Sequence, residues 1–267
     1  MPKKVPLSPE QETMLITLYA KAQADNPLFF DPYSKEVLDQ VVYDFSQLNV
    51  PYKTVILVSQ RAKKIDSVTR KFLAENPQGT VIQLGCGLDT RFWRVDNGLV
   101  HWVDLDMTPV IELRQQLFPE AERYQLISSS VTELAWIDSL PANGQPVLAI
   151  AEGLLMYLSE DDVKKLVLRL HERFPGAKLI ADVFSKLTAR SAAQHPSLKK
   201  TGASLGWGLN EPTEVEGWAP GIKFLSEWYF SDDPELAKLS LGYRVMYKLA
   251  GAFKVAKRAH RIVCFQL

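Results

Sequence analysis

The first eighty residues contain three consecutive segments in which apolar residues recur at helical spacing. The first segment follows a start at Ser8 that is typical of a capped helix, and it stops at Asn26-Pro27. Its apolar positions are Met14, Leu15, Leu18 and Ala22. The second segment covers residues 37–45, and the third spans residues 55–74. We therefore predict a mainly helical N-terminal region.

From Thr80 the pattern changes to short apolar runs that are bounded by glycines or polar residues. The five runs are TVIQLGCG, LVHWVDLD, ERYQLISSS, PVLAIAEG and AKLIADVF. Such runs are typical of strands, and the first suits a strand buried on both faces. Helical patterns separate them at residues 110–117 and 159–174, the latter starting with a capping box. This alternation predicts an α/β domain with a largely parallel sheet, right-handed crossovers and the helical N-terminal region packed outside.

The alternation fails between residues 185 and 220, a segment rich in Gly, Pro and Trp without any period. A long irregular stretch inside a compact domain is typical of a lid or a binding loop. After it, IKFLSEWYF and RAHRIVCFQL have the composition of two closing strands, and a helical segment is expected between residues 233 and 251.

Charge and length narrow the function classes. The chain has 267 residues, which suits one large domain, and its 31 Lys and Arg balance 31 Asp and Glu. No overall basic field attracts nucleic acid or an anionic membrane, so we expect neither as a partner. The densest apolar stretch, residues 147–158, is interrupted by Glu152, and the start MPKKVPLSPEQ lacks a signal-peptide core. These features favour a cytoplasmic protein.

The two cysteines, Cys86 and Cys264, lie far apart in the sequence and belong to no CxxC pair or Cys/His cluster. We therefore expect neither a bound metal nor a disulfide framework.

Two pairs of residues mark a candidate ligand site at the ends of the first two predicted strands. Gly85 and Gly87 allow the backbone to turn tightly and to approach a ligand closely. In an open α/β sheet, ligands bind beyond the carboxyl ends of the strands, where the strand order reverses. Asp104 and Asp106 follow about twenty residues later, as expected for carboxylates that accept hydrogen bonds from ribose hydroxyls. We prefer Asp104; a helix cap or a solvated turn is the alternative for both.

The residue at the third glycine position of the GxGxxG pattern helps to identify the cofactor. In dinucleotide-binding folds the third glycine of GxGxxG permits close packing around a pyrophosphate, and here that position is Thr90. GxGxD after a first strand is the form expected for S-adenosylmethionine, which has no phosphates. We therefore favour the methyl donor over a nicotinamide cofactor.

Several motifs, taken together, resemble the leucine carboxyl methyltransferase family, in particular a bacterial branch of polyketide synthesis. They are LGCGLDTRFWR, WVDLDMTPVIELR, and PVLAIAEGLLMYL followed by FPGAKLIAD. The segments ETMLITLYAKA, GWGL and EGWAPGI match that branch too, so the resemblance covers nearly the whole chain. It implies a class I methyltransferase fold, which is Rossmann-like: a seven-stranded, mostly parallel sheet with helices on both faces and an antiparallel last strand.

The resemblance also implies a division of the single domain and a set of donor-binding residues. Residues 1–78 would form a helical cover, 79–184 the cofactor-binding core, 185–221 a substrate-side insertion or lid, and 222–267 the closing strands. The implied donor ligands are Arg61 for the carboxylate, Gly85 and Gly87 in the loop, Asp104 for the ribose, Ser130 and Val131 beside the adenine, and Glu152 near the methionine end. Ser130 replaces the family's usual acid, and serine Oγ can still accept a hydrogen bond. Asp89 and Arg91 are expected to form a local salt bridge or cap.

The acceptor side is less defined. A carboxylate acceptor is already ionised at pH 7, whereas a phenol would benefit from a general base. His195, in the insertion, is the histidine that could act so; we expect ordinary surface or satisfied roles for His101, His171 and His260. Further candidates for the acceptor pocket are Tyr19, Tyr157 and Trp207, and an aromatic wall of Trp207, Trp218, Trp228 and Tyr229 would suit a planar acceptor. No catalytic residue is assigned.

These observations lead to one expected function with three alternatives. We expect an S-adenosylmethionine-dependent O-methyltransferase that acts on a carboxyl, or on a phenolic hydroxyl, of a small aromatic or polyketide-like metabolite and releases S-adenosylhomocysteine. The alternatives are methylation of a protein C-terminal carboxylate, a nicotinamide-dependent oxidoreductase, and a catalytically silent S-adenosylmethionine-binding domain. The sequence does not indicate an oligomeric state.

Overall fold

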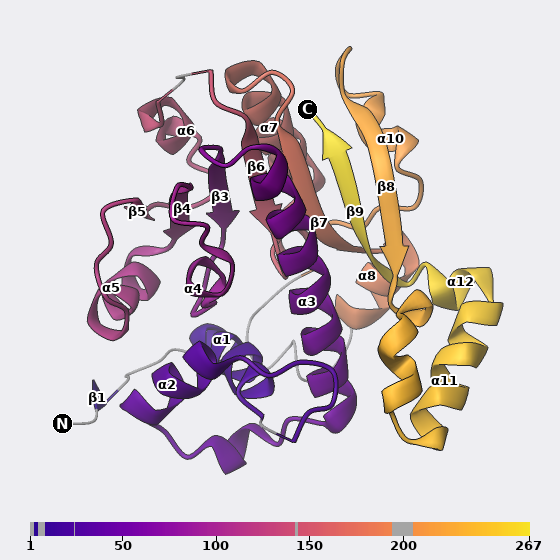
Figure 1. Cartoon of the computed structure of the whole chain (residues 1–267). Helices are drawn as coiled ribbons and strands as arrows, with labels where there is room; N and C mark the ends of the chain where they lie inside the picture. The colour runs from indigo at the N-terminus through magenta and orange to yellow at the C-terminus, as the bar shows by residue number, and fades with distance from the viewer. Residues whose placement is uncertain (1–2, 5–8, 24, 142–143, 194–204) are drawn as a thin grey trace.

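The computed structural model describes residues 3–4, 9–23, 25–141, 144–193 and 205–267, and its centre is a seven-stranded sheet (Figure 1). The strand order is β5-β4-β3-β6-β7-β9-β8. The strands are β3 (Thr80–Leu84), β4 (His101–Asp106), β5 (Tyr124–Ser128), β6 (Val147–Ala151), β7 (Lys178–Phe184), β8 (Lys223–Tyr229) and β9 (His260–Gln266). All neighbouring pairs from β5 to β7 are parallel, and β9 runs antiparallel to both β7 and β8. The predicted seven-stranded, mostly parallel fold is confirmed.

Helices cover both faces and one edge of this sheet. The longer ones are α1 (Pro9–Lys21), α2 (Pro32–Gln40), α3 (Tyr52–Glu75), α5 (Thr108–Leu117), α7 (Glu160–Arg173), α8 (Lys186–Ala193) and α11 (Leu241–Ala252). The shorter ones are α4 (Arg91–Val95), α6 (Ala135–Ser139), α10 (Thr213–Glu216) and α12 (Lys254–Lys257), with 3-10 turns η1 (Phe45–Leu48), η2 (Leu155–Tyr157), η3 (Phe230–Asp232) and η4 (Pro234–Lys238). Figure 1 shows α1 and α2 at the edge toward which the parallel strands point.

The predicted N-terminal helices are confirmed, with one correction. The second helix was expected over residues 37–45, but α2 ends at Gln40. Val41 is extended because β2 (Val41–Val42) pairs in parallel with β1 (Lys3–Lys4). The pairing satisfies backbone groups that the helix would otherwise have used. Ser8, the expected cap of the first helix, lies outside the described residues.

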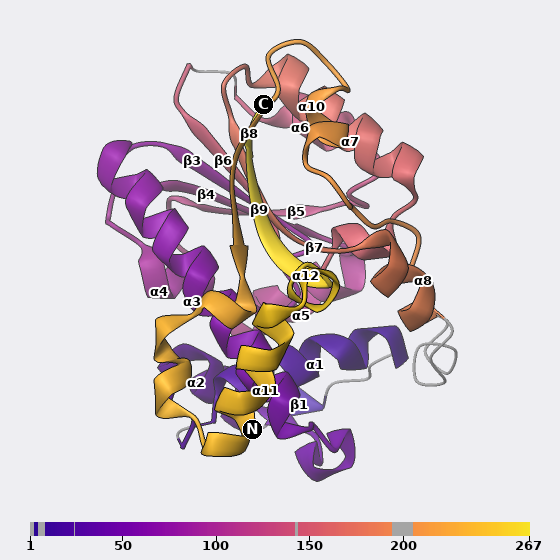
Figure 2. The same cartoon turned by 90° about the vertical axis from the view of Figure 1, so that its right-hand side faces the viewer.

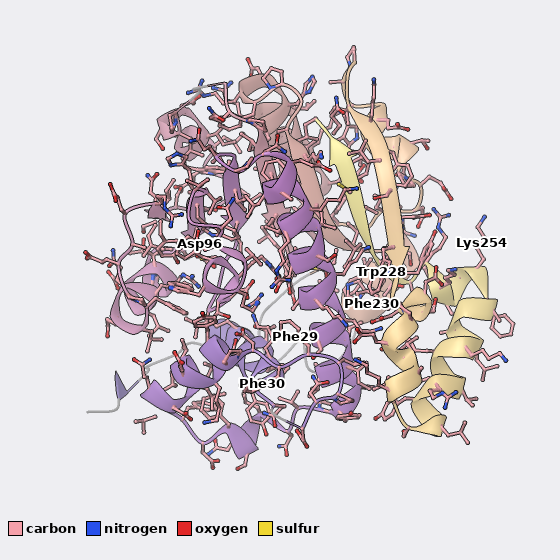
Figure 3. The ribbon with its side chains drawn as sticks, viewed as in Figure 1. Phe29, Phe30, Asp96, Trp228, Phe230 and Lys254 are labelled. Atoms are coloured by element: carbon pink, nitrogen blue, oxygen red, sulfur yellow. The ribbon has the colours of Figure 1, made fainter. Side chains whose placement is uncertain are left out.

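One face of the sheet packs against α3, α4 and the C-terminal helices, and Figure 2 shows α3 and α7 on opposite sides of the strands. The buried residues of α3 in this layer include Ile56, Ile65 and Phe72. Trp228 and Phe230 also lie here, with ring centroids 5.2 Å apart, beside the lower end of α3 in Figure 3.

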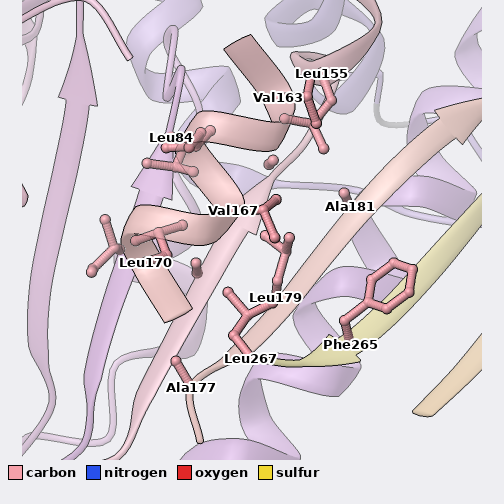
Figure 4. Packing of buried hydrophobic residues seen from close by; sticks show 14 of the residues in the cluster. Leu84, Leu155, Val163, Val167, Leu170, Ala177, Leu179, Ala181, Phe265 and Leu267 are labelled. Atoms are coloured by element: carbon pink, nitrogen blue, oxygen red, sulfur yellow. The ribbon is translucent and has the colours of Figure 1, made fainter. Parts of the chain in front are cut away.

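The opposite face packs against α7 (Figure 4). Helix α7 starts as expected, because Ser159 Oγ accepts a hydrogen bond from the backbone N–H of Asp162. Its buried stripe is Val163, Leu166, Val167 and Leu170, at helical spacing. Trp207 and Trp218 join this layer. The expected aromatic wall is therefore wrong, since its tryptophans are divided between the two faces.

Cys86 and Cys264 are buried and free, and no cluster of metal-ligating side chains occurs among the described residues. Within the same residues, no helix combines the length and apolar character needed to cross a bilayer.

The α7 face generates a stability prediction. Leu170, on the buried stripe of α7, is 1% exposed and packs against the sheet. Truncation of its side chain should therefore leave a cavity that the surrounding strands cannot fill. Leu170→Ala should lower the free energy of unfolding by about 2–5 kcal/mol. The measurement is denaturant unfolding, with Lys164→Ala, on the exposed side of the same helix, as the matched control. Equal stability of the two variants would contradict the packing.

Candidate functional site

A glycine turn lies where the strand order reverses. Strand β3 has β4 on one side and β6 on the other, and the chain turns immediately after Leu84. Gly85 and Gly87 have φ of +60° and +50°, a region that side chains rarely adopt. A Cβ at Gly85 would lie 2.9 Å from Leu154 Cδ1, a distance at which something must shift. The turn therefore requires glycine, as expected, and opens toward the carboxyl ends of the strands.

Polar contacts fix the shape of this turn. Asp106 Oδ2 accepts a hydrogen bond from the backbone N–H of Gly87 at 2.7 Å. From the other side, Arg114 Nη1 donates to the carbonyl oxygens of Gly87 and Asp89, at 2.8 and 2.9 Å. A charged donor on two carbonyls holds the backbone more strongly than a neutral one would.

The two candidate aspartates of β4 differ in access. Asp104 is 1% exposed, and its carboxylate accepts hydrogen bonds from Arg114 Nη2 at 2.5 Å, Tyr124 Oη at 2.6 Å and Trp102 Nε1 at 2.7 Å. It positions Arg114, which in turn holds the glycine turn. The preference for Asp104 as the ribose ligand does not fit this geometry well, because the carboxylate is buried and three side-chain donors already engage its two oxygens.

Asp106 lies at the end of β4 and is partly exposed. Its carboxylate accepts hydrogen bonds from the backbone N–H groups of Gly87 and Met107, and it forms no ion pair with a described residue. Burial raises the pKa of Asp106 above its ordinary value, although those two N–H groups oppose the rise. A carboxylate that has spare acceptor capacity and faces the turn suits a hydroxyl-bearing ligand better than Asp104 does.

A buried network of charged side chains, here called the ion cluster, lies beside the turn. Its members are Lys21, Asp31, Arg61, Asp66, Asp89, Arg91, Arg94, Glu152, Asp182 and His260. Each of these side chains is at most 13% exposed. The cluster joins α1, α2, α3 and α4 to the ends of β6, β7 and β9, so it fixes the helical cover on the sheet.

Arg61 and Glu152, expected near the methionine end of a donor, are in direct contact. Arg61 Nε donates to Glu152 Oε1 at 2.9 Å, and Arg61 Nη1 donates to Asp182 Oδ2 at 3.1 Å. Burial alone would lower the pKa of Arg61, but Asp182 and Glu152 outweigh it and raise that pKa. The Nη2 atom of Arg61 donates no hydrogen bond within the described chain and lies beside Gly153, whose Cβ would be 3.3 Å away. This nitrogen is free to bind an anion.

The Asp89 and Arg91 pair extends beyond the local salt bridge that was expected. Arg91 Nη1 lies 2.8 Å from Asp89 Oδ2, without hydrogen-bond geometry, and Arg91 Nη2 donates to Glu152 Oε2 at 2.5 Å. Lys21 Nζ donates to Asp89 Oδ1 at 2.5 Å and is 2% exposed. The role of Lys21 could not be predicted from the sequence, because a single lysine at the end of an amphipathic helix gives no sign that it turns inward.

The charges of the ion cluster do not cancel. It has five carboxylates (Asp31, Asp66, Asp89, Glu152 and Asp182) and four permanent cations (Lys21, Arg61, Arg91 and Arg94), which leaves one negative charge when His260 is neutral. Arg70 approaches Asp66 only at 4.0 Å and is 55% exposed, so solvent screens it. Burial of an unbalanced charge is costly, and a cationic ligand would relieve that cost.

The expected adenine neighbours lie after β5. Ser130 is partly exposed, and its Oγ lies 2.8 Å from Thr132 Oγ1. Val131 is 8% exposed and joins the core on the α7 face. The backbone N–H of Ser129 donates to the carbonyl oxygen of Asp106 at 3.0 Å, which keeps this loop next to the end of β4.

Of the acceptor-side candidates, Tyr157 lies at the site. Its side chain is 42% exposed. Burial is the main cause that raises the pKa of Tyr157; Arg61 opposes the rise and Asp182 adds to it. The phenol is thus within electrostatic reach of both groups. Tyr19 is partly buried and stacks on Phe45 at 5.9 Å. Trp207 is 5% exposed and packs in the core on the α7 face, and its place in the acceptor pocket stays a prediction. His195 lies outside the described residues.

His260 has a position that the sequence analysis did not anticipate. Because β9 is antiparallel to β7, the start of β9 reaches the edge where the parallel strands end, opposite Phe184. There His260 Nε2 lies 2.7 Å from Asp182 Oδ2. Asp182 also contacts Arg61 and the backbone N–H of Gly153. Burial would raise the pKa of Asp182, but Arg61 and His260 hold it below its ordinary value.

A hollow elsewhere on the molecule is not part of this site. Its volume is about 410 Å³, and its walls include Pro146, Val147, Phe174 and Ala177. These residues are at the amino ends of β6 and β7, on the opposite edge from the glycine turn. Chemistry on an open α/β sheet belongs to the carboxyl edge, so we assign the site there.

Comparisons with known proteins identify the family of this chain. A model of the leucine carboxyl methyltransferase family matches residues 13–171. Over 241 residues, the chain is 37% identical to the tetracenomycin polyketide synthesis O-methyltransferase TcmP of Streptomyces glaucescens, covering 89% of each chain. It is 30% identical to the S-adenosyl-L-methionine-dependent methyltransferase dpfgK of Gibberella zeae, covering 86% of this chain and 85% of that protein.

A solved structure of similar fold is a duf574 family protein from Streptomyces avermitilis, with a TM-score of 0.63 and 13% identity, covering 97% of this chain and 99% of that one. The family match also decides between the cofactors in favour of S-adenosylmethionine. The chain belongs to the leucine carboxyl methyltransferase family of S-adenosylmethionine-dependent O-methyltransferases.

Proposed function

We propose that the protein transfers a methyl group from S-adenosylmethionine to a carboxylate oxygen of a small aromatic or polyketide-like acceptor. The observation that supports S-adenosylmethionine as the methyl donor is the charge of the ion cluster. Its buried carboxylates exceed its permanent cations by one. At pH 7 the donor has one carboxylate, one ammonium and one sulfonium, a net charge of plus one. When bound, it supplies an electrophilic methyl group on a positive sulfur.

Each part of the donor has a partner among the residues at the carboxyl edge. Arg61 Nη2, which is free of protein acceptors, and the inward-turned Lys21 can bind the carboxylate. Glu152 can accept from the ammonium in addition to its two arginines. Asp106, in place of the sequence-based choice Asp104, can accept from the ribose hydroxyls. Ser130 and Val131 remain the proposed neighbours of the adenine.

The proposed acceptor is supported by the chemistry of methyl transfer and by a similar protein of known name. A carboxylate is ionised at pH 7, so the protein needs only to align it opposite the sulfur and to exclude water. Tyr157, exposed beside Arg61, is our candidate for the wall that receives it. The aromatic or polyketide-like class is supported by the similarity to the tetracenomycin polyketide synthesis O-methyltransferase of Streptomyces glaucescens.

A second candidate acceptor, a phenolic hydroxyl, is favoured by one observation. The Nε2 atom of His260 lies 2.7 Å from Asp182 Oδ2, and this contact holds the imidazole in one orientation. An imidazole so held can remove a proton from a hydroxyl that approaches its other nitrogen. A carboxylate acceptor needs no such group.

The proposed function is tested by binding and turnover. Calorimetric titration with S-adenosylhomocysteine should show binding at micromolar concentration, whereas NAD should show none. A panel of aromatic carboxylic acids and phenols, assayed with labelled donor, should then give methyl ester as the product. Donor binding without transfer to any acceptor would instead support a catalytically silent binding domain.

The two aspartates of β4 should respond differently to substitution. Asp106→Asn should weaken S-adenosylhomocysteine binding by about 1–3 kcal/mol, because it replaces one acceptor oxygen by a donor, and should lower stability by at most about 1.5 kcal/mol through the lost backbone hydrogen bond. Asp104→Asn should mainly lower stability, by up to about 3–5 kcal/mol, because it leaves Arg114 buried without its counter-charge. Calorimetry and thermal unfolding of both variants check this, and the reverse pattern would restore Asp104 as the ribose ligand.

Substitution of His260 distinguishes the two acceptors. If His260 acts as a base on a phenolic hydroxyl, His260→Gln should lower kcat about 100-fold or more, because the group that removes the proton is lost. With a carboxylate acceptor the same substitution should leave kcat nearly unchanged, since that acceptor is already ionised at pH 7. The measurement is turnover with each class of acceptor, and His101→Gln, at the exposed start of β4, is the matched control.

A further inference from the structure

Helix α11 presents its aliphatic side to solvent. Tyr247 is 9% exposed and Tyr243 packs in the α3 layer, so the tyrosine side faces the protein. Leu241, Val245 and Leu249 recur at four-residue spacing and are 70%, 48% and 57% exposed. Met246, Phe253 and Val255 extend the same surface, with exposures of 44%, 66% and 69%. An amphipathic helix normally buries such a stripe, so this one lacks its partner among the described residues.

The charged residues that residues 241–255 contribute to this surface are all basic, and two carboxylates, Glu211 and Glu227, line a hollow beside Lys254. The sequence contains no Asp or Glu from residue 236 to residue 267, although the whole chain is neutral. Lys257 and Arg258 pair with Asp232 and Glu211. Arg244, Lys248 and Lys254 form no ion pair with any described residue, and Figure 3 shows Lys254 pointing away from the body of the molecule.

We infer that residues 241–255 form a docking surface for an anionic phospholipid bilayer. A helix with an apolar face and a lysine- and arginine-rich flank is the pattern of interfacial membrane binding. α11 has 12 residues, and it lies at the outer edge of the molecule in Figure 1 and on the side that faces the viewer in Figure 2. It is too short to cross a bilayer and would lie in the headgroup region. The neutral net charge of the chain conceals this basic region, which is why the sequence analysis expected no membrane partner.

Charge complementarity selects the bilayer over a second copy of the chain. A two-fold interface would place the same patch against itself and bring Arg244, Lys248 and Lys254 near their own equivalents. Anionic headgroups would instead neutralise these cations, and each basic residue near such a surface raises partitioning roughly fivefold.

The test is co-sedimentation of the full chain with vesicles. We compare vesicles of phosphatidylcholine alone with vesicles of equal parts phosphatidylcholine and phosphatidylglycerol. The wild type should bind the anionic vesicles and should bind the neutral vesicles weakly or not at all. It should dissociate from the anionic vesicles at high salt. Replacing the three cations (R244Q, K248Q and K254Q together) should reduce partitioning about 100-fold. Replacing the apolar residues (L241S, L249S and F253S together) should reduce it about tenfold or more.

The controls separate docking from general stickiness and from misfolding. Leu99 and Leu187 are 49% and 62% exposed but lie elsewhere, so the L99S and L187S double variant should bind as the wild type does. Thermal unfolding should be unchanged in every variant, because the replaced side chains are exposed. Absence of binding to anionic vesicles would overturn the inference. Concentration-dependent dimers that the L241S, L249S and F253S variant abolishes, without vesicle binding, would assign the surface to a second copy.

Discussion

Arg91 and Arg94, from the short helix that follows the glycine turn, connect the layers of this molecule. Arg91 is completely buried and reaches Asp66 on α3 and Glu152 after β6, and Arg94 binds Asp31 before α2 as well as Asp66. Removal of one partner from such a pair leaves an uncompensated buried charge. The helical cover, the turn and the sheet edge are therefore positioned by the same set of interactions.

That arrangement has a functional consequence. Fixed charges that are already oriented do not have to reorganise when a ligand with several charges arrives. Arg61 stays protonated because Asp182 and Glu152 face it, and Glu152 stays anchored because two arginines hold it. The network supports the fold, and under the proposed function it would also serve as a preorganised receptor for a donor that has several charges. A substitution in the ion cluster that weakens ligand binding should therefore usually lower the stability of the fold as well.

The sheet could be predicted from the sequence because its strands are apolar runs of ordinary length between turn signals. Helix α7 was equally clear, since Ser159 caps it and a regular apolar stripe follows. The end of α2 was not predictable, because its boundary depends on pairing between Val41–Val42 and the distant Lys3–Lys4. The division of the late tryptophans between two faces likewise depends on how β8 and the preceding segment lie in space.

Many of the candidate site residues lie together at the carboxyl edge of the sheet, and the features of that edge that the sequence did not reveal share one cause. Asp104 and Asp106 are two residues apart on a strand, so both point to the same face, and only depth distinguishes them. That depth follows from the register: Asp104 pairs with Gln83, inside β3, whereas Asp106 lies one residue beyond Leu105, the partner of Leu84. Similarly, His260 comes to the carboxyl edge only because β9 runs antiparallel. A single sequence gives residue types and spacing, but register and strand direction determine which carboxylates and imidazoles remain open to a ligand.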